Sequence, residues 1–192
     1  MKIGVLALQG AFAEHISILR NLEVDTMPVR SPQQLVELDG LVIPGGESTT
    51  ITKLLQSYDL MDKINNLIKM GLPILGTCAG MIVLAKEISD STIQPIGAMA
   101  IKVRRNAFGR QRESFESELS IPVLGEKAFP GVFIRAPVIE QANSDVEVIA
   151  RLADGTMVAA KQDKLLACAF HPELTDDMRL HKYFLDIISG ER

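Results

Sequence analysis

Blocks of apolar residues alternate with amphipathic blocks along the first half of the chain, and this order predicts strands and helices in turn. Residues 3–8 form a continuous apolar run of strand length, which is typical of a strand buried on both faces of a sheet. Residues 11–22 then place apolar side chains at helical spacing. We expect further strands at 24–29, 41–43 and 74–75, helices at 49–56, 60–70 and 79–86, and a short helix opened by Ser31 and Pro32. This alternation predicts a mostly parallel sheet with helices on both faces.

The second half shows short apolar segments separated by turns, which predict strands without intervening helices. We expect these strands at residues 98–103, 115–119, 132–134, 146–151, 158–161 and 165–169. Asp154-Gly155 is a hairpin signal between two of them. Residues 105–113 are expected to form a loop, and a helix at about 176–188 ends the chain. The expected fold class is a three-layer α/β fold with a mostly parallel central sheet, helices on both faces and a few antiparallel strands in the C-terminal half.

Length and charge narrow the classes of protein to consider. With 192 residues, the chain is long enough for one α/β domain with a sizeable core and too short for two, so we expect residues 1–192 to form a single domain. The net charge of −4 argues against nucleic acid as a partner. No apolar run approaches the roughly 18 residues of a membrane span. Two cysteines cannot form a disulfide framework, and the first residues lack a signal-peptide cleavage site, so we expect a cytoplasmic protein away from membranes.

Candidate chemistry begins at Cys78, in the turn Gly76-Thr77-Cys78-Ala79-Gly80 between an apolar strand and a helix. This pattern is typical of a nucleophile elbow with sulfur in place of a serine oxygen, and glycines flank it because a Cβ on either side would clash with a neighbouring element. The helix that follows directs its N-terminus at the sulfur and favours the thiolate. We therefore expect Cys78 to expose a nucleophilic sulfur, whereas Cys168, inside an apolar strand, is expected to be a buried hydrophobe.

A candidate base and a carboxylate follow another strand, in Phe170-His171-Pro172-Glu173. His171 could be a satisfied core histidine or a helix cap, or it could serve as the general base with Glu173 orienting its ring. Its distance from Cys78 in sequence is no obstacle, because such partners meet in space. His15 and His181 lie on predicted helices and are expected at the surface. No spacing typical of a metal site occurs, and we expect neither a metal nor a cofactor.

Pro44-Gly45-Gly46-Glu47-Ser48 is a second glycine-rich turn at the end of a strand. It could be a plain turn with Ser48 as the N-cap of the next helix. It could also form an oxyanion hole, because glycine lets backbone N–H groups approach a developing negative charge. The two interpretations are compatible. The turn is not a phosphate-binding P-loop, since the later Gly-Lys-Ser/Thr is missing.

Together these segments resemble class I, or triad, glutamine amidotransferases, and most closely the glutaminase subunits of the two-protein pyridoxal 5′-phosphate synthases. The resemblance covers essentially the whole chain and rests on segments 6–10, 44–50, 76–80, 105–111, 133–137 and 170–174, in that order. Many class I glutaminase domains carry glutamine at the position of Ile82, and the pyridoxal phosphate subgroup commonly has an aliphatic residue there. Ile82 therefore favours the narrower assignment.

The resemblance implies a function and a partner. Members hydrolyse L-glutamine to L-glutamate and ammonia through a cysteine thioester. They pass the ammonia to a synthase subunit that makes pyridoxal 5′-phosphate from ribose 5-phosphate and glyceraldehyde 3-phosphate. The synthase subunit is a TIM-type barrel, and twelve copies of it assemble with twelve of the glutaminase.

The resemblance also implies residue roles. Cys78 is the nucleophile, His171 the general base and acid, and Glu173 the residue that orients His171. The glutamine site is implied at Gly46, Glu47, Ser48, Arg105, Ile134 and Arg135, with the oxyanion donors at Gly46 and Ala79. Gln9 and Gly10 close the first strand at the same edge of the sheet, and we expect the partner to dock there and activate the site.

Two other classes of protein stay open at this point. One is a cysteine peptidase or a stress-response protein of the same α/β type, and the presence of Arg105 and Arg135, which suit free glutamine, argues against it. The other is a catalytically silent regulatory subunit, and the intact set Cys78, His171 and Glu173 argues against it.

Overall fold

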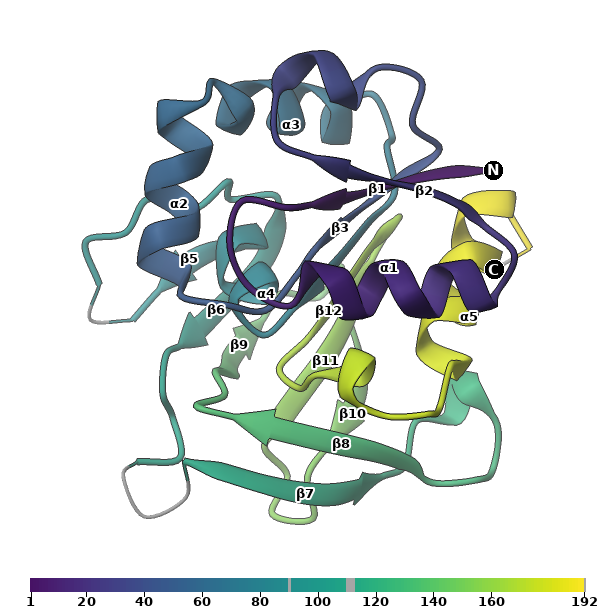
Figure 1. Ribbon diagram of the computed structural model, residues 1–192. Coiled ribbons are helices and arrows are strands. Elements are labelled where there is room, and N and C mark those ends of the chain that lie inside the picture. The colour runs from purple at the N-terminus through teal and green to yellow at the C-terminus, as the bar shows by residue number, and fades with distance from the viewer. Residues whose placement is uncertain (90, 110–112, 192) are drawn as a thin grey trace.

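A ten-stranded sheet runs through the molecule in the computed structural model, which describes residues 1–89, 91–109 and 113–191 (Figure 1). Its strand order is β2-β1-β3-β4-β12-β11-β9-β6-β5, and β10 pairs with β11. The parallel part consists of β2 (Asp25–Val29), β1 (Lys2–Leu6), β3 (Gly40–Ile43), β4 (Ile74–Thr77) and β12 (Leu165–Cys168). Every residue of β3, β4 and β12 is buried. Their largely apolar sequences follow from that position, because both faces of these strands are covered.

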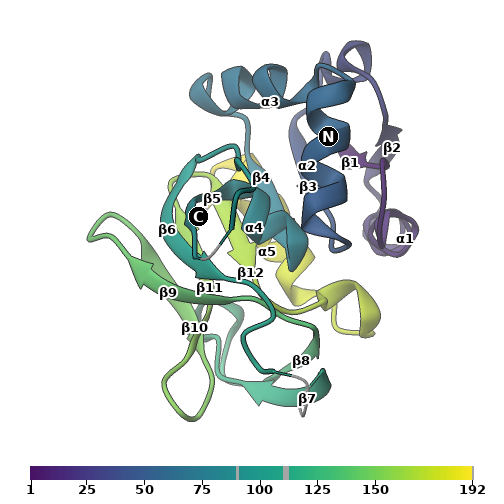
Figure 2. The same cartoon turned by 90° about the vertical axis from the view of Figure 1, so that its left-hand side faces the viewer.

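The other strands pair mostly antiparallel, and they form the edge of this sheet and a smaller second one (Figure 2). The main sheet continues through β11 (Met157–Gln162), β9 (Val138–Ala142), β6 (Met99–Arg104) and β5 (Ala85–Ile88), with β10 (Glu147–Arg151) beside β11. The second sheet pairs β7 (Ser114–Leu119) with β8 (Phe129–Ile134). The predicted hairpin at Asp154-Gly155 is confirmed, since these residues join the antiparallel pair β10 and β11. The predicted fold class is confirmed as well.

Helices cover both faces of the parallel strands. The α-helices are α1 (Phe12–Asn21), α2 (Ser48–Ser57), α3 (Leu60–Lys69), α4 (Ala79–Leu84) and α5 (Arg179–Ser189), and short 3₁₀ helices occur at Pro32–Leu35, Pro122–Leu124 and Pro172–Leu174. Adjacent residues of a strand point to opposite faces of the sheet. The contacts of Gly76 and Thr77 in β4 therefore show which helices cover each face. A Cβ on Gly76 would meet α4, whereas the side chain of Thr77 contacts His15 of α1. The helices α1 and α5 share the second face, because His15 bonds to His181.

Several predicted boundaries are wrong. The helix expected at 79–86 ends at Leu84, because Ala85 begins β5, which pairs with β6. The strand β9 was not predicted. The final helix begins at Arg179 rather than near 176. Residues 105–109 are irregular as predicted, and the remaining part of that expected loop at 110–112 lies outside the described residues. Among the residues that the structure describes, no helix is long and apolar enough to cross a membrane.

Candidate active site

Four loops meet at one edge of the sheet, because β1, β3, β4 and β12 are parallel neighbours and their carboxyl ends lie together (Figure 1). The loop after β1 carries Gln9, and the loop after β3 carries Gly45. Cys78 follows β4 directly, and His171 follows β12. The topology therefore gathers four segments that the sequence separates widely.

Cys78 sits on a strained turn. Its backbone has φ of 49° and ψ of −102°, a conformation that residues with a Cβ rarely adopt. A Cβ on Gly76 would lie 2.8 Å from the backbone of Gly80, and a Cβ on Gly80 would overlap the carbonyl oxygen of Ile43. The expected reason for the flanking glycines is thus confirmed: the turn lies too close to α4 and β3 to admit a side chain at either position.

The sulfur of Cys78 is less exposed than expected. The residue is only 6% exposed, which corrects the prediction of an exposed sulfur. Ile134, at the end of β8, lies over it, with its carbonyl oxygen 3.9 Å from Cys78 Sγ. The backbone N–H of Cys78 donates to the carbonyl oxygen of Cys168 at 2.8 Å, which fixes the elbow to β12. Cys168 itself is fully buried, as predicted, and burial raises the pKa of its thiol well above 9.

Hydrogen bonds to β8 and to Glu173 hold His171 in place. Its backbone N–H donates to the carbonyl oxygen of Val132 in β8 at 2.8 Å, and its Nδ1 lies 2.7 Å from Glu173 Oε1. Burial alone would lower the pKa of His171, but hydrogen bonds with Cys78 and Glu173 outweigh it and raise the pKa to about 10. His171 is therefore protonated at neutral pH, with its charge between a carboxylate and a sulfur.

A buried polar cluster lies behind Glu173. Glu173 is 5% exposed, and its second oxygen, Oε2, lies 3.3 Å from Nε2 of His15. His15 Nε2 also lies 3.1 Å from Thr77 Oγ1, and His15 Nδ1 lies 2.9 Å from His181 Nε2. The prediction that His15 and His181 are surface residues is therefore wrong. Helical spacing could have shown this, because each lies three positions from a buried residue of its helix, Ile18 and Phe184 respectively.

The glycine-rich loop after β3 packs directly against the triad. A Cβ on Gly45 would overlap the ring of His171 and lie 3.4 Å from Cys78 Cβ, so only glycine fits there. The Gly45 N–H donates to Thr77 Oγ1 at 3.1 Å. Sequence reasoning placed Gly46 in the site and passed over Gly45. The side chain of Gln9 lies beside Gly46, and Gln9 Oε1 accepts the N–H of Glu47 at 2.8 Å.

The loop after β1 touches this glycine-rich loop through the backbone as well. The Ala11 N–H donates to the carbonyl oxygen of Gly45 at 3.1 Å. Gly10 has φ of 97°, and a Cβ on it would overlap the same carbonyl. Gln9 and Gly10 therefore adjoin the glycine-rich loop, as their place in the sheet predicted.

Glu47, not Ser48, is the N-cap of α2, which corrects the expected turn. Its carboxylate accepts from the N–H groups of Thr49 and Thr50 at 3.0 and 2.8 Å, while Ser48 is buried as the first residue of the helix. Slight burial would raise the pKa of Glu47, but hydrogen bonds from Thr50 and Thr49 outweigh it and lower the pKa to about 2. Arg105 Nη2 lies 3.1 Å from Glu47 Oε1, so a glutamate and an arginine expected to bind glutamine form an ion pair.

Ala79 is next to Cys78 in the sequence, and Arg135 is next to Ile134, whose carbonyl oxygen lies 3.9 Å from Cys78 Sγ. Arg135 follows Ile134, has φ of 43°, and donates its N–H to the carbonyl oxygen of Glu113 at 2.6 Å. Ala79 is the first residue of α4, so its N–H precedes the hydrogen-bonded part of that helix.

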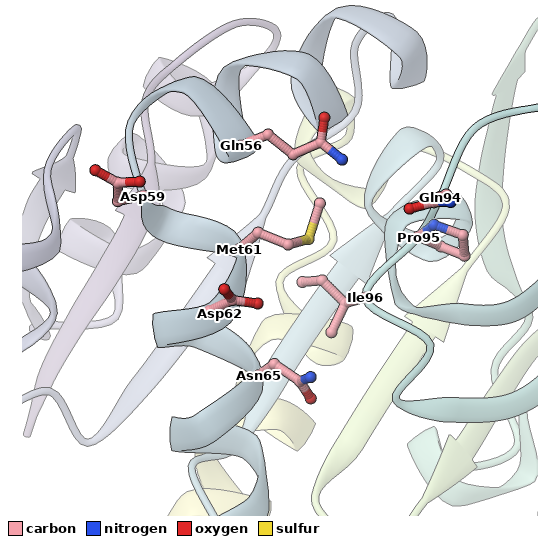
Figure 3. A pocket seen from close by; sticks show the side chains of 8 residues that line it. All are labelled: Gln56, Asp59, Met61, Asp62, Asn65, Gln94, Pro95 and Ile96. Carbon is pink, nitrogen blue, oxygen red and sulfur yellow. The ribbon is translucent and has the colours of Figure 1, made fainter.

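A pocket of about 420 Å³ lies away from this site, between α2, α3 and the segment before β6 (Figure 3). Its lining includes Gln56, Met61, Asp62, Gln94 and Ile96, none of which belongs to the triad or to its loops. Among the described residues, no group of three or more His, Cys, Asp or Glu side chains could hold a metal ion.

Comparison with known proteins gives a consistent result. Residues 5–189 match the SNO glutamine amidotransferase family. A pyridoxal 5′-phosphate synthase subunit PdxT from Carboxydothermus hydrogenoformans is 55% identical over 186 residues, which is 97% of each chain. A protein of the same name from Herpetosiphon aurantiacus is 57% identical over 190 residues, 97% of this chain and all of that one.

Solved structures agree with these relatives. A crystal structure described as a glutamine amidotransferase superimposes with a TM-score of 0.92 and 48% identity, over 97% of this chain and 98% of the other. A putative GMP synthase component from Thermoplasma acidophilum superimposes with a TM-score of 0.70 and 21% identity, over 100% of this chain and 96% of the other. At that identity the likeness concerns the fold alone.

Proposed function

This chain belongs to the SNO glutamine amidotransferase family, and we propose that residues 1–192 form one glutaminase domain with Cys78, His171 and Glu173 as its catalytic triad. The protein hydrolyses L-glutamine to L-glutamate and ammonia and supplies the ammonia to pyridoxal 5′-phosphate synthesis. The observation that best supports the triad is the 2.7 Å contact between His171 Nδ1 and Glu173 Oε1, beside a cysteine on a strained elbow. This contact occupies Nδ1 and leaves Nε2 as the ring nitrogen that would serve the sulfur.

The first step is attack on the side-chain amide. The thiolate of Cys78 adds to the carbonyl carbon of glutamine, and the C–O double bond opens to an oxyanion. When the oxyanion collapses, the C–N bond breaks and His171 gives its proton to the departing nitrogen, so that ammonia leaves. The raised pKa of His171, about 10, supports this role because the ring carries a proton at neutral pH. A thioester between Cys78 and the glutamyl group remains.

The second step is hydrolysis of the thioester. Neutral His171 takes a proton from water, and the hydroxide equivalent adds to the thioester carbonyl. Collapse breaks the C–S bond, releases L-glutamate and returns the Cys78 thiolate beside protonated His171. Glu173 orients the ring of His171 and stabilises the imidazolium in each step.

Other residues of the loops would bind the substrate and the oxyanion. The N–H groups of Gly46 and Ala79 are the proposed oxyanion donors, and one such donor is worth on the order of 100- to 1000-fold in rate. We assign the glutamine site to Gly46, Glu47, Ser48, Arg105, Ile134 and Arg135. Free glutamine carries an α-carboxylate that suits an arginine and an α-ammonium that suits the ionised Glu47. The ion pair of Arg105 with Glu47 supports this, since it already places both charges together.

The partner is the synthase subunit of pyridoxal 5′-phosphate synthase. We propose that this partner is a TIM-type barrel, that twelve copies of it assemble with twelve of this chain, and that the complex works in the cytoplasm. Ammonia would pass to the barrel without meeting bulk water, where it would become ammonium.

Glutamine hydrolysis by matched cysteine variants tests the triad. Cys78→Ala should release no glutamate from glutamine while keeping its fold, whereas Cys168→Ala should retain nearly full activity, because Cys168 is buried away from solvent. With the synthase and ammonium salts, the Cys78→Ala complex should still make pyridoxal 5′-phosphate. If the Cys78 variant keeps glutaminase activity, or if it fails with ammonium despite normal assembly, the proposed ammonia-supply role of Cys78 is wrong.

The same assay separates the alternatives. A peptide substrate should not be cleaved, since cleavage would favour a peptidase. Absence of glutamate release by the wild-type complex would favour a silent regulatory subunit.

A further inference from the structure

Two buried histidines lie behind the triad and have no part in the two chemical steps. His15 of α1 and His181 of α5 are both fully buried. Their rings contact each other through His15 Nδ1 and His181 Nε2, 2.9 Å apart, with centroids separated by 5.1 Å. The other nitrogen of His15, Nε2, lies between Thr77 Oγ1 at 3.1 Å and Glu173 Oε2 at 3.3 Å. The cluster therefore forms a chain of contacts from α5 through α1 to the carboxylate of the triad.

The contacts decide which nitrogen of each ring carries hydrogen. Both rings are neutral at pH 7, because burial keeps the pKa of His181 at about 4 and that of His15 well below 6.5. If His15 carried its hydrogen on Nδ1, its Nε2 lone pair would face the negative Glu173. His181 would then carry a hydrogen on Nδ1, an atom that has no partner among the described residues. A buried donor without an acceptor is costly.

The opposite arrangement gives the hydrogen of each ring an acceptor and turns no ring lone pair toward Glu173. His181 donates from Nε2 to His15 Nδ1, and His15 presents Nε2–H to Thr77 Oγ1 and the nearby Glu173 Oε2. His181 Nδ1 is then a bare lone pair, which leaves no ring N–H unpaired. The polar order is thus fixed from His181 to His15 and onward to Glu173 and Thr77.

We propose, on the basis of the function assigned above, that His15 is a positioning residue of the glutaminase site, oriented by His181. Its Nε2–H lies beside the second oxygen of Glu173, at an N–O distance of 3.3 Å, and attracts it electrostatically, so that the first oxygen stays aligned with His171 Nδ1. Through Thr77 Oγ1, which accepts the N–H of Gly45 at 3.1 Å, it also steadies the glycine-rich loop. One ring therefore joins the carboxylate side of the triad to the loop on its other side.

The contact to Glu173 gives His15 more than a packing role. Among the described residues, Oε2 of Glu173 is buried and receives no well-aligned hydrogen bond, so the nearby N–H is its main favourable neighbour. A carboxylate that loses this neighbour can rotate toward other donors, and His171 rotates with it. The expected consequence is a slower chemical step with little change in glutamine binding, because the proposed glutamine contacts lie elsewhere.

A matched pair of amides at position 15 separates the two nitrogens of the ring. The amide nitrogen of glutamine reaches about as far as imidazole Nε2, and the asparagine amide reaches about as far as Nδ1. His15→Gln should keep the donor to Glu173 and Thr77 and lose the bond to His181. His15→Asn should keep contact with His181 and lose the donor. Each variant loses one side of the ring, so thermal unfolding of the two should be similar.

In the complex with the synthase, kcat for glutamine should fall about 10- to 100-fold in His15→Asn and no more than about threefold in His15→Gln, with KM nearly unchanged in both. The kcat of His181→Phe, which removes only the N–H that His181 donates to His15, should lie between the values of the two amide variants. It serves as the readout if His15→Asn does not fold. Equal kcat values in the two amide variants, or a loss confined to KM, would overturn the proposal.

The experiment also distinguishes this inference from the triad itself. If Cys78→Ala is inactive and His15→Asn has wild-type kcat, the triad stands and the positioning role is wrong. If Cys78→Ala is active, the proposed site is wrong whatever the position 15 variants do.

Discussion

At the residue scale, burial of neutral histidines makes stability depend on pH. An unfolded imidazole titrates near pH 6.5, whereas burial lowers the pKa of folded His181 to about 4. The folded pKa is the lower one, so the stabilisation is complete above about pH 6.5 and is lost as the pH falls from there through about 4. The loss can reach about 3 kcal/mol for His181. His15 adds to it in the same direction, since burial lowers its pKa, and so does positive charge on His181, once that ring is protonated, and on His171.

Comparison of the wild type with His181→Gln isolates this effect. Glutamine can donate to His15 and does not titrate. Between pH 7.5 and pH 4.5, urea unfolding should show the wild type losing about 2 kcal/mol more than the variant. Carboxylates titrate in the same range but contribute to both proteins, so they cancel. If the two stabilities fall in parallel, His181 does not stay neutral in the folded state.

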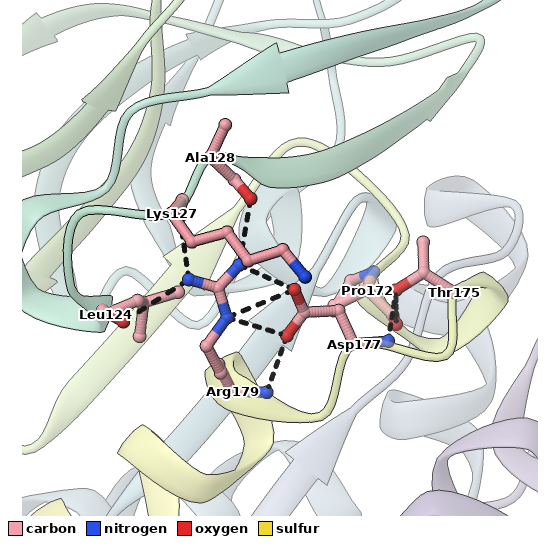
Figure 4. Close-up of polar contacts among 7 residues, drawn as sticks. All are labelled: Leu124, Lys127, Ala128, Pro172, Thr175, Asp177 and Arg179. Carbon is pink, nitrogen blue, oxygen red and sulfur yellow. Dashed lines mark hydrogen bonds and ion pairs between the residues drawn. The ribbon is translucent and has the colours of Figure 1, made fainter.

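At the scale of elements, one arginine fastens the last helix to the second sheet (Figure 4). Arg179, the first residue of α5, donates to the carbonyl oxygens of Lys127 at 2.7 Å and Ala128 at 2.9 Å, just before β8. It also bonds to both carboxylate oxygens of Asp177, at distances of 2.6 to 3.1 Å. The segment that follows His171 is thereby tied to the strand on which the His171 backbone also rests.

Replacement of Arg179 by methionine keeps the apolar part of the side chain and removes these bonds. We expect the free energy of unfolding to fall by about 2 kcal/mol, because several charge-assisted hydrogen bonds and their acceptors lose partners. Arg151→Met is a suitable control, since among the described residues Arg151 makes one exposed hydrogen bond, to the Gly155 carbonyl, and its replacement should cost less than about 1 kcal/mol. Equal losses in the two variants would show that the Arg179 bonds add nothing.

The strands also show which elements of the fold the sequence could predict. The strands β1, β3, β4 and β12 were found because burial on both faces leaves a continuous apolar run. The strand β5 was missed because its middle residues, Lys86 and Glu87, are exposed, so it continues a helical pattern. Its identity depends on pairing with β6, a contact that local periodicity does not encode.

For the candidate site, the sequence indicated residues that come after a buried strand and missed contacts between elements distant in sequence. Cys78 and His171 were proposed from their place after apolar runs. The bond between His15 and His181 joins residues 166 positions apart, and a histidine on a helix gives no local sign of a polar partner. The contact of Gly45 with His171 was missed for a different reason, since the adjacent Gly45 and Gly46 look alike in the sequence.

At the scale of the whole molecule, we propose that the partner docks on the loop around Gln9, which adjoins the candidate site. Gln9 Oε1 already accepts the N–H of Glu47, next to the proposed oxyanion donor Gly46. A partner that displaces this side chain would free the loop to reorient. We expect glutamate release by the isolated chain to be slow and to rise at least about 10-fold with saturating synthase. This rise is smaller than the rate effect of on the order of 100- to 1000-fold that one oxyanion donor contributes.

Gln9→Lys should blunt this rise, because it removes the acceptor and adds a charge at the contact. Lys69→Glu, on an exposed end of α3, also changes a charge and should leave the rise intact. Full activity of the isolated wild-type chain, unaltered by the partner, would contradict activation by docking and leave the ammonia-supply role unaffected.

The pairing of β12 with β4 has a consequence for synthesis of the protein on the ribosome. β4 ends at the nucleophile, but its partner strand begins only at Leu165, so translation must continue for on the order of ten seconds before the two can pair. During that time β4, with the sequence Ile-Leu-Gly-Thr, is the open edge of an unfinished sheet and is able to pair with another nascent chain. His171 arrives with the strand that closes this edge. A growing chain therefore gains its proposed base only as this open edge is covered, so we expect a partly made chain not to hydrolyse glutamine.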